Sequence, residues 1–216
     1  MVVYDTADPY AGEYDQEIVV TTSDWYHSES PGLIATMLSS SNPNALPPFP
    51  DGVLLNDQSS LSFEPKPNTT YKVRLISMAA FAGIIFAVDN HTADIIELDG
   101  VYTERTTASQ VRIAPAQRYS FLITTKDTTD TNYAFTAILD ENQNFEASGA
   151  VWPLNATGYI NYDTSLPKAS TYTVDTLSPI DDFGIPPYDG QALIGAPDNS
   201  VILNFQFGLD DLSIPR

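Results

Sequence analysis

The clearest strand in the sequence is Tyr71-Lys72-Val73-Arg74-Leu75-Ile76, in which large apolar residues alternate with charged ones as far as Leu75. Successive side chains of a strand point to opposite faces, so this alternation predicts a strand with one buried and one wet face. Short runs rich in β-branched and aromatic residues recur on both sides of it between turn signals, which is typical of an antiparallel sandwich or barrel. These runs are residues 17–22, 53–55, 61–63, 84–88, 120–124, 133–137 and 201–205.

Two further stretches have strand character with a turn inside or after them. In Ile95-Ile96-Glu97-Leu98-Asp99-Gly100-Val101, the Asp-Gly pair supplies a turn. Residues 111–122 read as two strand halves separated at Pro115. Arg118 either clamps an anion or, partly buried, binds loop carbonyls or a carboxylate such as Asp99.

One helix is expected, over residues 31–39, because Ser28 or Ser30 can cap it and a proline lies near its start. We expect it to be a crossover helix. A proline-rich loop follows over residues 42–52, since its prolines lack the backbone donors that a sheet needs. Residues 181–188 are expected to cross a surface in extended conformation.

The charge balance restricts the partners of this chain. Its 216 residues include 9 basic and 28 acidic side chains, for a net charge of −19. Nine scattered cations cannot form the basic face that binding to nucleic acid requires, and an anionic membrane surface is disfavoured for the same reason. With 43% hydrophobic and 17% charged residues, the chain is typical of a folded globular protein with one main domain.

The absence of cysteine excludes a disulfide framework, a thiolate metal site and a blue-copper centre in this chain. Two histidines, His27 and His91, are too few for an imidazole cluster. The longest apolar run, residues 78–88, is too short for a membrane span of about 20 residues. Residues 1–4 lack the basic start and apolar stretch of a secretion signal, so we expect any signal to lie outside this sequence.

The most distinctive motif is Ser23-Asp24-Trp25-Tyr26-His27, directly after a strand. It predicts a strand end where Trp25 and Tyr26 pack in the core and their polar tips find partners. An aspartate near a histidine would also suit acid–base chemistry, but no nucleophile or second histidine accompanies Asp24 and His27.

Three Asn-x-Thr triplets, at Asn68, Asn90 and Asn155, are acceptors for N-glycosylation and favour a secreted eukaryotic origin. Acidic pairs could gather hard cations through oxygen ligands, or could be solvated faces. These pairs are at residues 140–141, 181–182 and 210–211.

Five stretches, in the same order and spacing along nearly the whole chain, resemble the middle cupredoxin domain of a three-domain multicopper oxidase. The resemblance implies an all-β, cupredoxin-like Greek-key β-sandwich with one short crossover helix. The stretches are Ser23 to His27, the Asn42-Pro43 loop leading to Asn56, Pro67 to Ile76, Ile96 to Val101, and Ala116 to Ser120.

Within that family the chain is most similar to the fungal Fet3-like ferroxidases. Phe81 resembles the phenylalanine of that branch, where many laccases carry an aspartate that contacts phenolic substrate. The resemblance makes residues 1–15 a linker from a preceding cupredoxin domain, 16–165 the central domain, 166–199 a linker, and 200–216 the first strand of a following domain. The copper ligands of the family would lie in the other two domains, so this chain holds no cofactor of its own.

One position departs from the family pattern. The proline-rich loop of Fet3-like ferroxidases carries a glutamate that ligates Fe(II), and Pro47 stands there in this sequence, with no carboxylate between Asn42 and Phe49. Either iron binds through Asp140, Glu141 or Glu146, or the parent enzyme oxidises phenolic donors. Pro47 and Phe81 are expected to line the substrate approach.

The resemblance therefore implies a domain with a structural and substrate-wall role that is inactive alone. The parent enzyme would oxidise Fe(II) or phenols and pass the electrons to copper sites that reduce O2 to water. We expect it to be extracellular or at the cell surface, with an iron permease as a partner and no direct membrane contact from this chain. The alternative is a non-catalytic β-sandwich module for binding or interaction.

Overall fold

A computed structural model of the chain describes residues 2–127, 129–140, 154–191, 195 and 198–204. The described residues form eleven strands, one α-helix and one short 3-10 helix. The strands are β1 (Gln16–Trp25), β2 (Gly52–Leu55), β3 (Ser60–Phe63), β4 (Thr70–Ser77), β5 (Ile84–Val88), β6 (Ala93–Leu98), β7 (Val101–Ala108), β8 (Gln110–Ile113), β9 (Arg118–Thr124), β10 (Tyr133–Leu139) and β11 (Asn155–Ile160). The helices are α1 (Ser30–Met37) and η1 (Asp182–Gly184).

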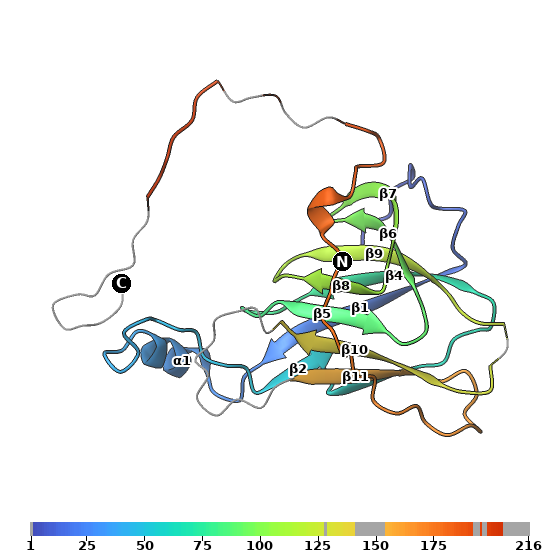
Figure 1. The fold of residues 1–216 in the computed structure, drawn as a ribbon, viewed down its shortest axis with the longest axis horizontal. Helices are drawn as coiled ribbons and strands as arrows, with labels where there is room; N and C mark the ends of the chain where they lie inside the picture. Colours follow the sequence, from blue (N-terminus) through green and yellow to red (C-terminus); the bar gives the residue numbers. More distant parts are fainter. Residues whose placement is uncertain (1, 128, 141–153, 192–194, 196–197, 205–216) are drawn as a thin grey trace.

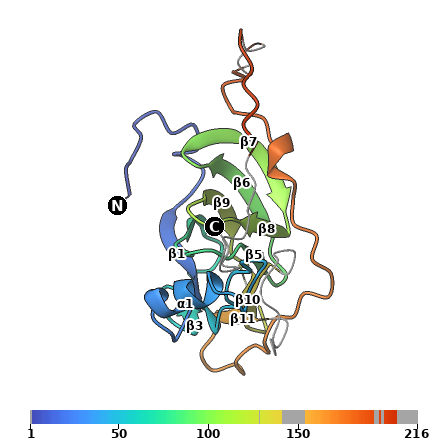
Figure 2. The same cartoon turned by 90° about the vertical axis from the view of Figure 1, so that its left-hand side faces the viewer.

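The strands form two sheets that pack face to face (Figure 1, Figure 2). The larger sheet has the order β2-β1-β4-β9-β6-β7 and the smaller one β3-β11-β10-β5-β8. The prediction of an all-β, cupredoxin-like sandwich is therefore confirmed. The sheets are not purely antiparallel, because β1 pairs with β4 and β11 pairs with β3 in parallel.

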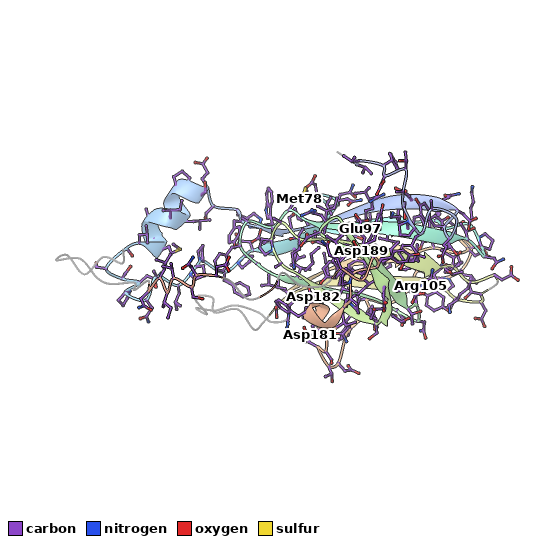
Figure 3. The ribbon with its side chains drawn as sticks, turned by 90° about the horizontal axis from the view of Figure 1, so that it is seen from above. Met78, Glu97, Arg105, Asp181, Asp182 and Asp189 are labelled. Carbon is purple, nitrogen blue, oxygen red and sulfur yellow. The ribbon has the colours of Figure 1, made fainter. Side chains whose placement is uncertain are left out.

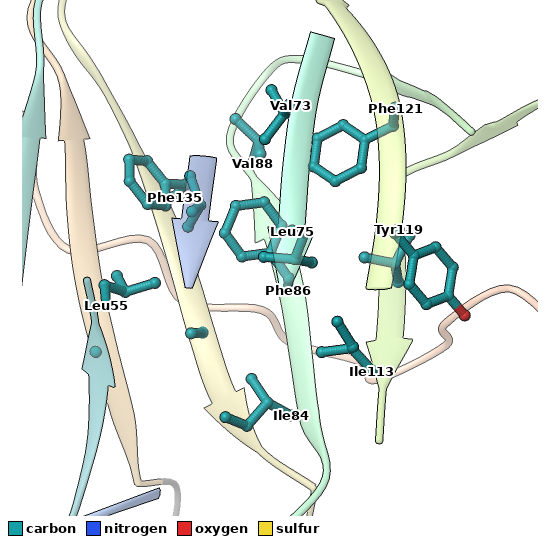
Figure 4. Packing of buried hydrophobic residues seen from close by; sticks show 14 of the residues in the cluster. Leu55, Val73, Leu75, Ile84, Phe86, Val88, Ile113, Tyr119, Phe121 and Phe135 are labelled. Carbon is teal, nitrogen blue, oxygen red and sulfur yellow. The ribbon is translucent and has the colours of Figure 1, made fainter. Parts of the chain in front are cut away.

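The core lies between the sheets and takes its side chains from both of them (Figure 4). The predicted strand at residues 71–76 is β4, and its apolar Val73 and Leu75 lie in this core, 4% and 0% exposed. The expected turn at Asp99-Gly100 joins β6 to β7, with positive φ angles of 49° and 89° that suit aspartate and glycine.

The other face of β4 is not wet, contrary to the prediction. Lys72 on this face is 0% exposed, because residues 5–14, here called the N-terminal strap, cross the outer face of the larger sheet. Tyr10 of the strap packs with Ile96 and Leu122, and its hydroxyl donates to the carbonyl of Thr103 at 2.7 Å.

The single predicted helix is present as α1, at nearly the predicted residues, but it is not a crossover helix. It lies in the connection between β1 and β2, which pair directly as antiparallel neighbours, so it does not cross from one sheet to the other. None of its residues is buried, and it stands apart from the sandwich in Figure 3. Its N-cap is Glu29, without a side-chain hydrogen bond, so neither Ser28 nor Ser30 caps it as expected.

Residues 181–188 cross the surface beside β7, as predicted, but residues 182–184 form η1 and not the expected extended conformation. The amide of Glu104 donates to the carbonyl of Pro186 at 2.9 Å, and that of Tyr188 to the carbonyl of Tyr102 at 2.8 Å. Residues 201–204 are not in a strand, and 205–216 lie outside the described residues, so a strand of a following domain stays a prediction. Within the described part of the chain, neither helix has the length and apolar character needed to cross a bilayer.

Candidate functional site

One end of the sandwich gathers most of the residues that the sequence singled out. β1 and β4 are parallel neighbours and finish there at Trp25 and Ser77. The β4–β5 connection, residues 78–83, returns the chain from this end to the smaller sheet. β10 finishes beside it, since the amide of Asp140 donates to the carbonyl of Gly83 at 2.9 Å.

The carboxylate of Asp24 holds the 78–83 loop in place. This side chain is only 7% exposed. Its oxygens accept hydrogen bonds from three successive backbone amides, those of Ala80 at 2.7 Å, Phe81 at 3.0 Å and Ala82 at 2.9 Å. Burial of a carboxylate is tolerated where several donors replace its water, so the clamp fixes the path of this loop.

The clamped loop presents apolar side chains to solvent. Phe81 is 48% and Met78 51% exposed, and Trp25 on the neighbouring strand end is 48% exposed. The prediction that Trp25 packs in the core is therefore wrong. Tyr26 is half-buried, and its hydroxyl donates to Asp24 at 3.3 Å. Burial, followed by the charge of Asp24, raises the pKa of Tyr26.

The motif does not form an acid–base pair. Asp24 is occupied by backbone amides, and His27 is exposed and pairs with Asp51 instead, with Nδ1 of His27 3.2 Å from Oδ2 of Asp51. The backbone amide of His27 donates to the same carboxylate oxygen at 2.7 Å. These contacts join the strand end to the loop that precedes β2.

The proline-rich loop is braced from within by Asn42, which is 5% exposed. Its amide nitrogen donates to the carbonyl of Leu46 at 2.9 Å and its oxygen accepts from the amide of Leu46 at 3.2 Å. Pro47 follows directly and is half-buried. The loop then returns to the core through Phe49, which packs against it.

Of the three acidic residues named for an iron path, the structure describes only Asp140. Its side chain is 6% exposed, and its Oδ2 lies 2.8 Å from Nε of Arg112, so a cation already neutralises it. Glu141 and Glu146 lie outside the described residues, and the iron path stays a prediction. Across the described residues, no cluster of three or more His, Cys, Asp or Glu side chains is placed to hold a metal ion.

The other acidic candidates have structural partners where the structure describes them. Asp182 accepts from the hydroxyl of Tyr119 at 2.7 Å, and Asp181 accepts from the amide of Phe183 at 3.2 Å at the start of η1. Arg118 pairs with Asp99 at 2.9 Å, as one alternative proposed, although its side chain is exposed rather than partly buried. The pair at residues 210–211 lies outside the described residues.

The three candidate glycosylation residues, Asn68, Asn90 and Asn155, are all exposed. Asn68 and Asn90 lie in turns with positive φ angles of 47° and 50°, and Asn155 begins β11. Sequence reasoning missed the role of Asp24 as the anchor of the 78–83 loop. The only signal was an acidic residue at an inward-facing position of a strand end.

Comparison with known proteins identifies the family of this chain. The profile of the multicopper oxidase family matches residues 16–165. The chain is 39% identical to the iron transport multicopper oxidase FET3 of Gibberella zeae over 94% of its length, and 41% identical to the iron transport multicopper oxidase fetC of Epichloe festucae over 94%. It covers 32% and 33% of those two relatives, about a third of each.

The fold comparison agrees. The crystal structure of Fet3p, a multicopper oxidase that functions in iron import, matches 98% of this chain with a TM-score of 0.89 and 30% identity, and the match covers 40% of that protein. The laccase of Botrytis aclada shares the fold, with a TM-score of 0.64 at 23% identity over 81% of this chain and 35% of the laccase. The chain therefore belongs to the multicopper oxidase family, and along its length it is similar to the fungal Fet3-like iron transport oxidases.

Proposed function

We propose that this chain is the middle domain of a multicopper oxidase, where it holds the two copper-bearing domains apart and forms one wall of the approach for the reducing substrate. One observation carries this proposal. Over 94% of its length, the chain is similar to about a third of the length of two iron transport multicopper oxidases. The parent enzyme would oxidise Fe(II) or a phenolic donor and reduce O2 to water with four electrons.

The residues of this chain do not fit a copper site. A blue-copper site needs a thiolate and a trinuclear cluster needs several imidazoles, whereas the sequence has no cysteine and two histidines. One of them, His91, uses both ring nitrogens inside the fold, with Nδ1 2.7 Å from the carbonyl of Asp89 and Nε2 2.9 Å from the hydroxyl of Tyr162. Copper chemistry would therefore belong to the other domains, and this chain would be inactive alone.

The wall is the end of the sandwich described above. Phe81 is held outward by the clamp on its own amide, and Pro47 lies in a braced loop that follows the same end of β1. Neither side chain carries a charge or a metal-binding atom, so the wall suits contact with an organic donor better than ligation of iron. Iron binding would then require Asp140, Glu141 or Glu146.

The cellular location and the partner of the parent enzyme are part of the proposal. Glycosylation at the exposed Asn68, Asn90 and Asn155 fits passage through the secretory pathway and a place outside the cell or at its surface. An iron permease would be the partner if the parent acts in iron transport, as the names of its relatives indicate for them.

Metal content and activity test the proposal when this chain and its full-length parent are purified side by side. We expect copper, blue colour and oxidase activity in the parent, and no stoichiometric copper or activity in the 216-residue chain. One tight copper per chain with blue colour would overturn the copper-free assignment. A parent that oxidises neither Fe(II) nor a phenol would leave the alternative of a binding or interaction module.

Substitution of the wall residue tests the second half of the proposal. In the full-length parent, Phe81→Ala is expected to raise the KM for a phenol several-fold. The matched control is Val101→Ala, which truncates another exposed apolar side chain, 56% exposed at the start of β7. Equal KM values for the two variants and the unmodified parent would remove Phe81 from the substrate wall.

A further inference from the structure

A cavity of about 330 Å³ lies between the two sheets. Its walls come from the strand ends opposite to the 78–83 loop, since they include the start of β4 and the ends of β5 and β9. Figure 4 shows several of these side chains converging from both sheets. The apolar walls include Val20, Val73, Val88, Phe86, Phe121 and Phe135.

The pairing of the strands explains why this space stays open. β2 pairs with only the last four residues of β1, from Thr22 to Trp25, and then turns away at Asn56. In the part of the chain that the structure describes, the first half of β1 therefore has β4 as its only strand neighbour. β3 forms the edge of the other sheet, and its Ser62 is exposed. Ile18 of β1 and Leu61 of β3 line the cavity and are only partly buried, so the space opens to solvent between these two strands.

The ring of Phe135, which forms part of the cavity wall, packs against a glycine of the neighbouring strand. Gly158 of β11 has no Cβ, and the ring of Phe135 on neighbouring β10 occupies the place where a Cβ would lie. Any larger residue at 158 would displace that ring. A glycine inside a strand commonly marks such a close approach.

Most of the polar groups that line the cavity already have partners within the protein, and the rest of the lining is apolar. The walls therefore offer a polar ligand few hydrogen-bonding groups, and burying a polar ligand without a partner is costly. Asn56 binds the amide of Thr21 at 2.6 Å and the carbonyl of Val19 at 3.3 Å, and His91 binds Asp89 and Tyr162. The hydroxyl of Thr125 accepts from the amide of Thr69 at 2.9 Å and donates to the carbonyl of Lys66 at 2.7 Å. The hydroxyl of Tyr71 accepts from the amide of Lys66 at 2.9 Å.

We propose that this cavity is a binding site for a small apolar molecule of the size of an alkylbenzene. An enclosed apolar cavity of about 150 Å³ binds benzene, and this partly open one has about twice that volume. Its size and apolar lining also lie in the range of known ligand pockets. The site does not depend on the proposed function, because its walls belong to the opposite end of the sandwich.

Toluene and phenol are a matched pair of probes, because they have nearly the same shape and differ in one hydroxyl. We expect one toluene per chain to bind saturably, with a rise in Tm of about 4 °C at ten times its Kd. Phenol is expected to bind at least about tenfold more weakly, because most of the wall is apolar and burying its hydroxyl against apolar side chains is costly. Absence of saturable toluene binding, or a preference for phenol, would overturn the proposal.

Two valine substitutions locate the binding. Val73→Trp places a large ring in the cavity, so it is expected to keep or raise Tm and to weaken toluene binding at least about tenfold. Val53→Trp makes the same change at a core position that does not line the cavity, so it is expected to lower Tm and leave toluene binding unchanged. Toluene binding that survives Val73→Trp would overturn the assignment.

Methyl NMR on the unmodified chain keeps the test independent of the folding of either variant. Toluene is expected to shift the methyl signals of Ile18, Val20 and Val73 and to leave those of Val53 and Ile113 in place. The full-length parent is titrated in the same way. If the chain binds toluene and the parent does not, the rest of the parent polypeptide covers the opening between β1 and β3, and the proposed binding site is wrong for the parent.

Discussion

The Nζ atom of Lys72 lies 2.7 Å from Oδ2 of Asp8, and the two side chains are 0% and 6% exposed. The ammonium group also lies near the rings of Tyr14 and Tyr102, with centroids 5.2 and 5.7 Å from Nζ. Lys72 is on β4 and Asp8 on the N-terminal strap, so a buried ion pair joins residues 64 positions apart. The strap is thereby fixed over the outer face of the larger sheet.

We expect Asp8→Asn to destabilise the chain by roughly 3 kcal/mol, because it leaves the charge of Lys72 buried without its main partner. Urea unfolding of the 216-residue chain measures this change. Glu13→Gln is the control, since Glu13 lies on the same strap and its ion pair with Arg105 of β7 joins two side chains that are each more than 40% exposed. That variant is expected to cost less than about 1 kcal/mol. Equal losses in the free energy of unfolding for the two variants would contradict the view that burial makes the Asp8–Lys72 pair matter more than the exposed one.

The same pair predicts an acid limit to stability. Burial acts to raise the pKa of Asp8, but the hydrogen bonds from Lys72 and the amide of Tyr10, with the charge of Lys72, outweigh it and lower the pKa below its ordinary value. The unfolded chain therefore binds a proton at higher pH than the folded one. Stability from this group is present above about pH 4, the ordinary value, and is lost as the pH falls through the lowered pKa. Unfolding free energies between pH 5 and 2.5 should fall less steeply in Asp8→Asn.

Alternation predicted β4 correctly but misjudged its outer face, and the reason is physical. A charged residue between apolar ones indicates solvent unless another part of the chain supplies a counter-ion. Here Asp8 comes from a segment whose sequence gives no periodic signal. Trp25 was misjudged for the opposite reason, because an aromatic residue at a strand end is exposed when none of the described residues covers it.

The candidate site was predictable only in outline. The Phe81 loop was placed from a family resemblance, and the structure adds why the loop holds its shape, through amide contacts from residues 80–82 to Asp24. Contacts of this kind join residues 56 to 58 positions apart. A sequence pattern reports local periodicity, so a carboxylate that serves distant backbone amides looks the same as one that faces water.

We expect Asp24→Asn to cost roughly 2 kcal/mol, since an amide offers one acceptor oxygen in place of two and turns N–H groups toward backbone donors. Urea unfolding gives the loss, and faster amide exchange at Ala80, Phe81 and Ala82 would locate it. Asp51→Asn is the control, because this exposed carboxylate at the same end accepts a single backbone bond, from His27. Unchanged exchange at residues 80–82 would show that the carboxylate does not hold the loop.

His91 predicts a second pH dependence, nearer neutrality. Burial lowers its pKa below the ordinary value of 6.5, and the hydrogen bond to the carbonyl of Asp89 only partly opposes this. Below about pH 6.5 the unfolded chain binds the proton first, so stability should fall as the pH drops from 7 until the folded pKa is reached. Unfolding free energies at pH 7.5, 6.5 and 5.5 measure the slope. His91→Gln should flatten it and His27→Gln should retain it.

The proline-rich loop supplies the last prediction, which concerns the substrate of the parent enzyme. Fe(II) is a cation that carboxylate oxygen suits, and carboxylate ligation also favours Fe(III), which drives the loss of an electron. Pro47 offers neither charge nor a donor atom. In the full-length parent, Pro47→Glu is therefore expected to raise kcat/KM for Fe(II) by about tenfold, the change that about 1.4 kcal/mol of added stabilisation produces, and to leave phenol oxidation little changed.

Pro43→Glu is the matched control for this variant, because it adds the same charge to an exposed proline of the same loop, inside the turn that Asn42 braces through Leu46. A general electrostatic attraction of Fe(II) to the loop would raise kcat/KM in both variants, whereas ligation at one position would raise it only in Pro47→Glu. If the unmodified parent already oxidises Fe(II) with a micromolar KM and Pro47→Glu gains nothing, iron reaches the enzyme by another path. Asp140 would be its only described acidic candidate, and its pairing with Arg112 at 2.8 Å would then have to open.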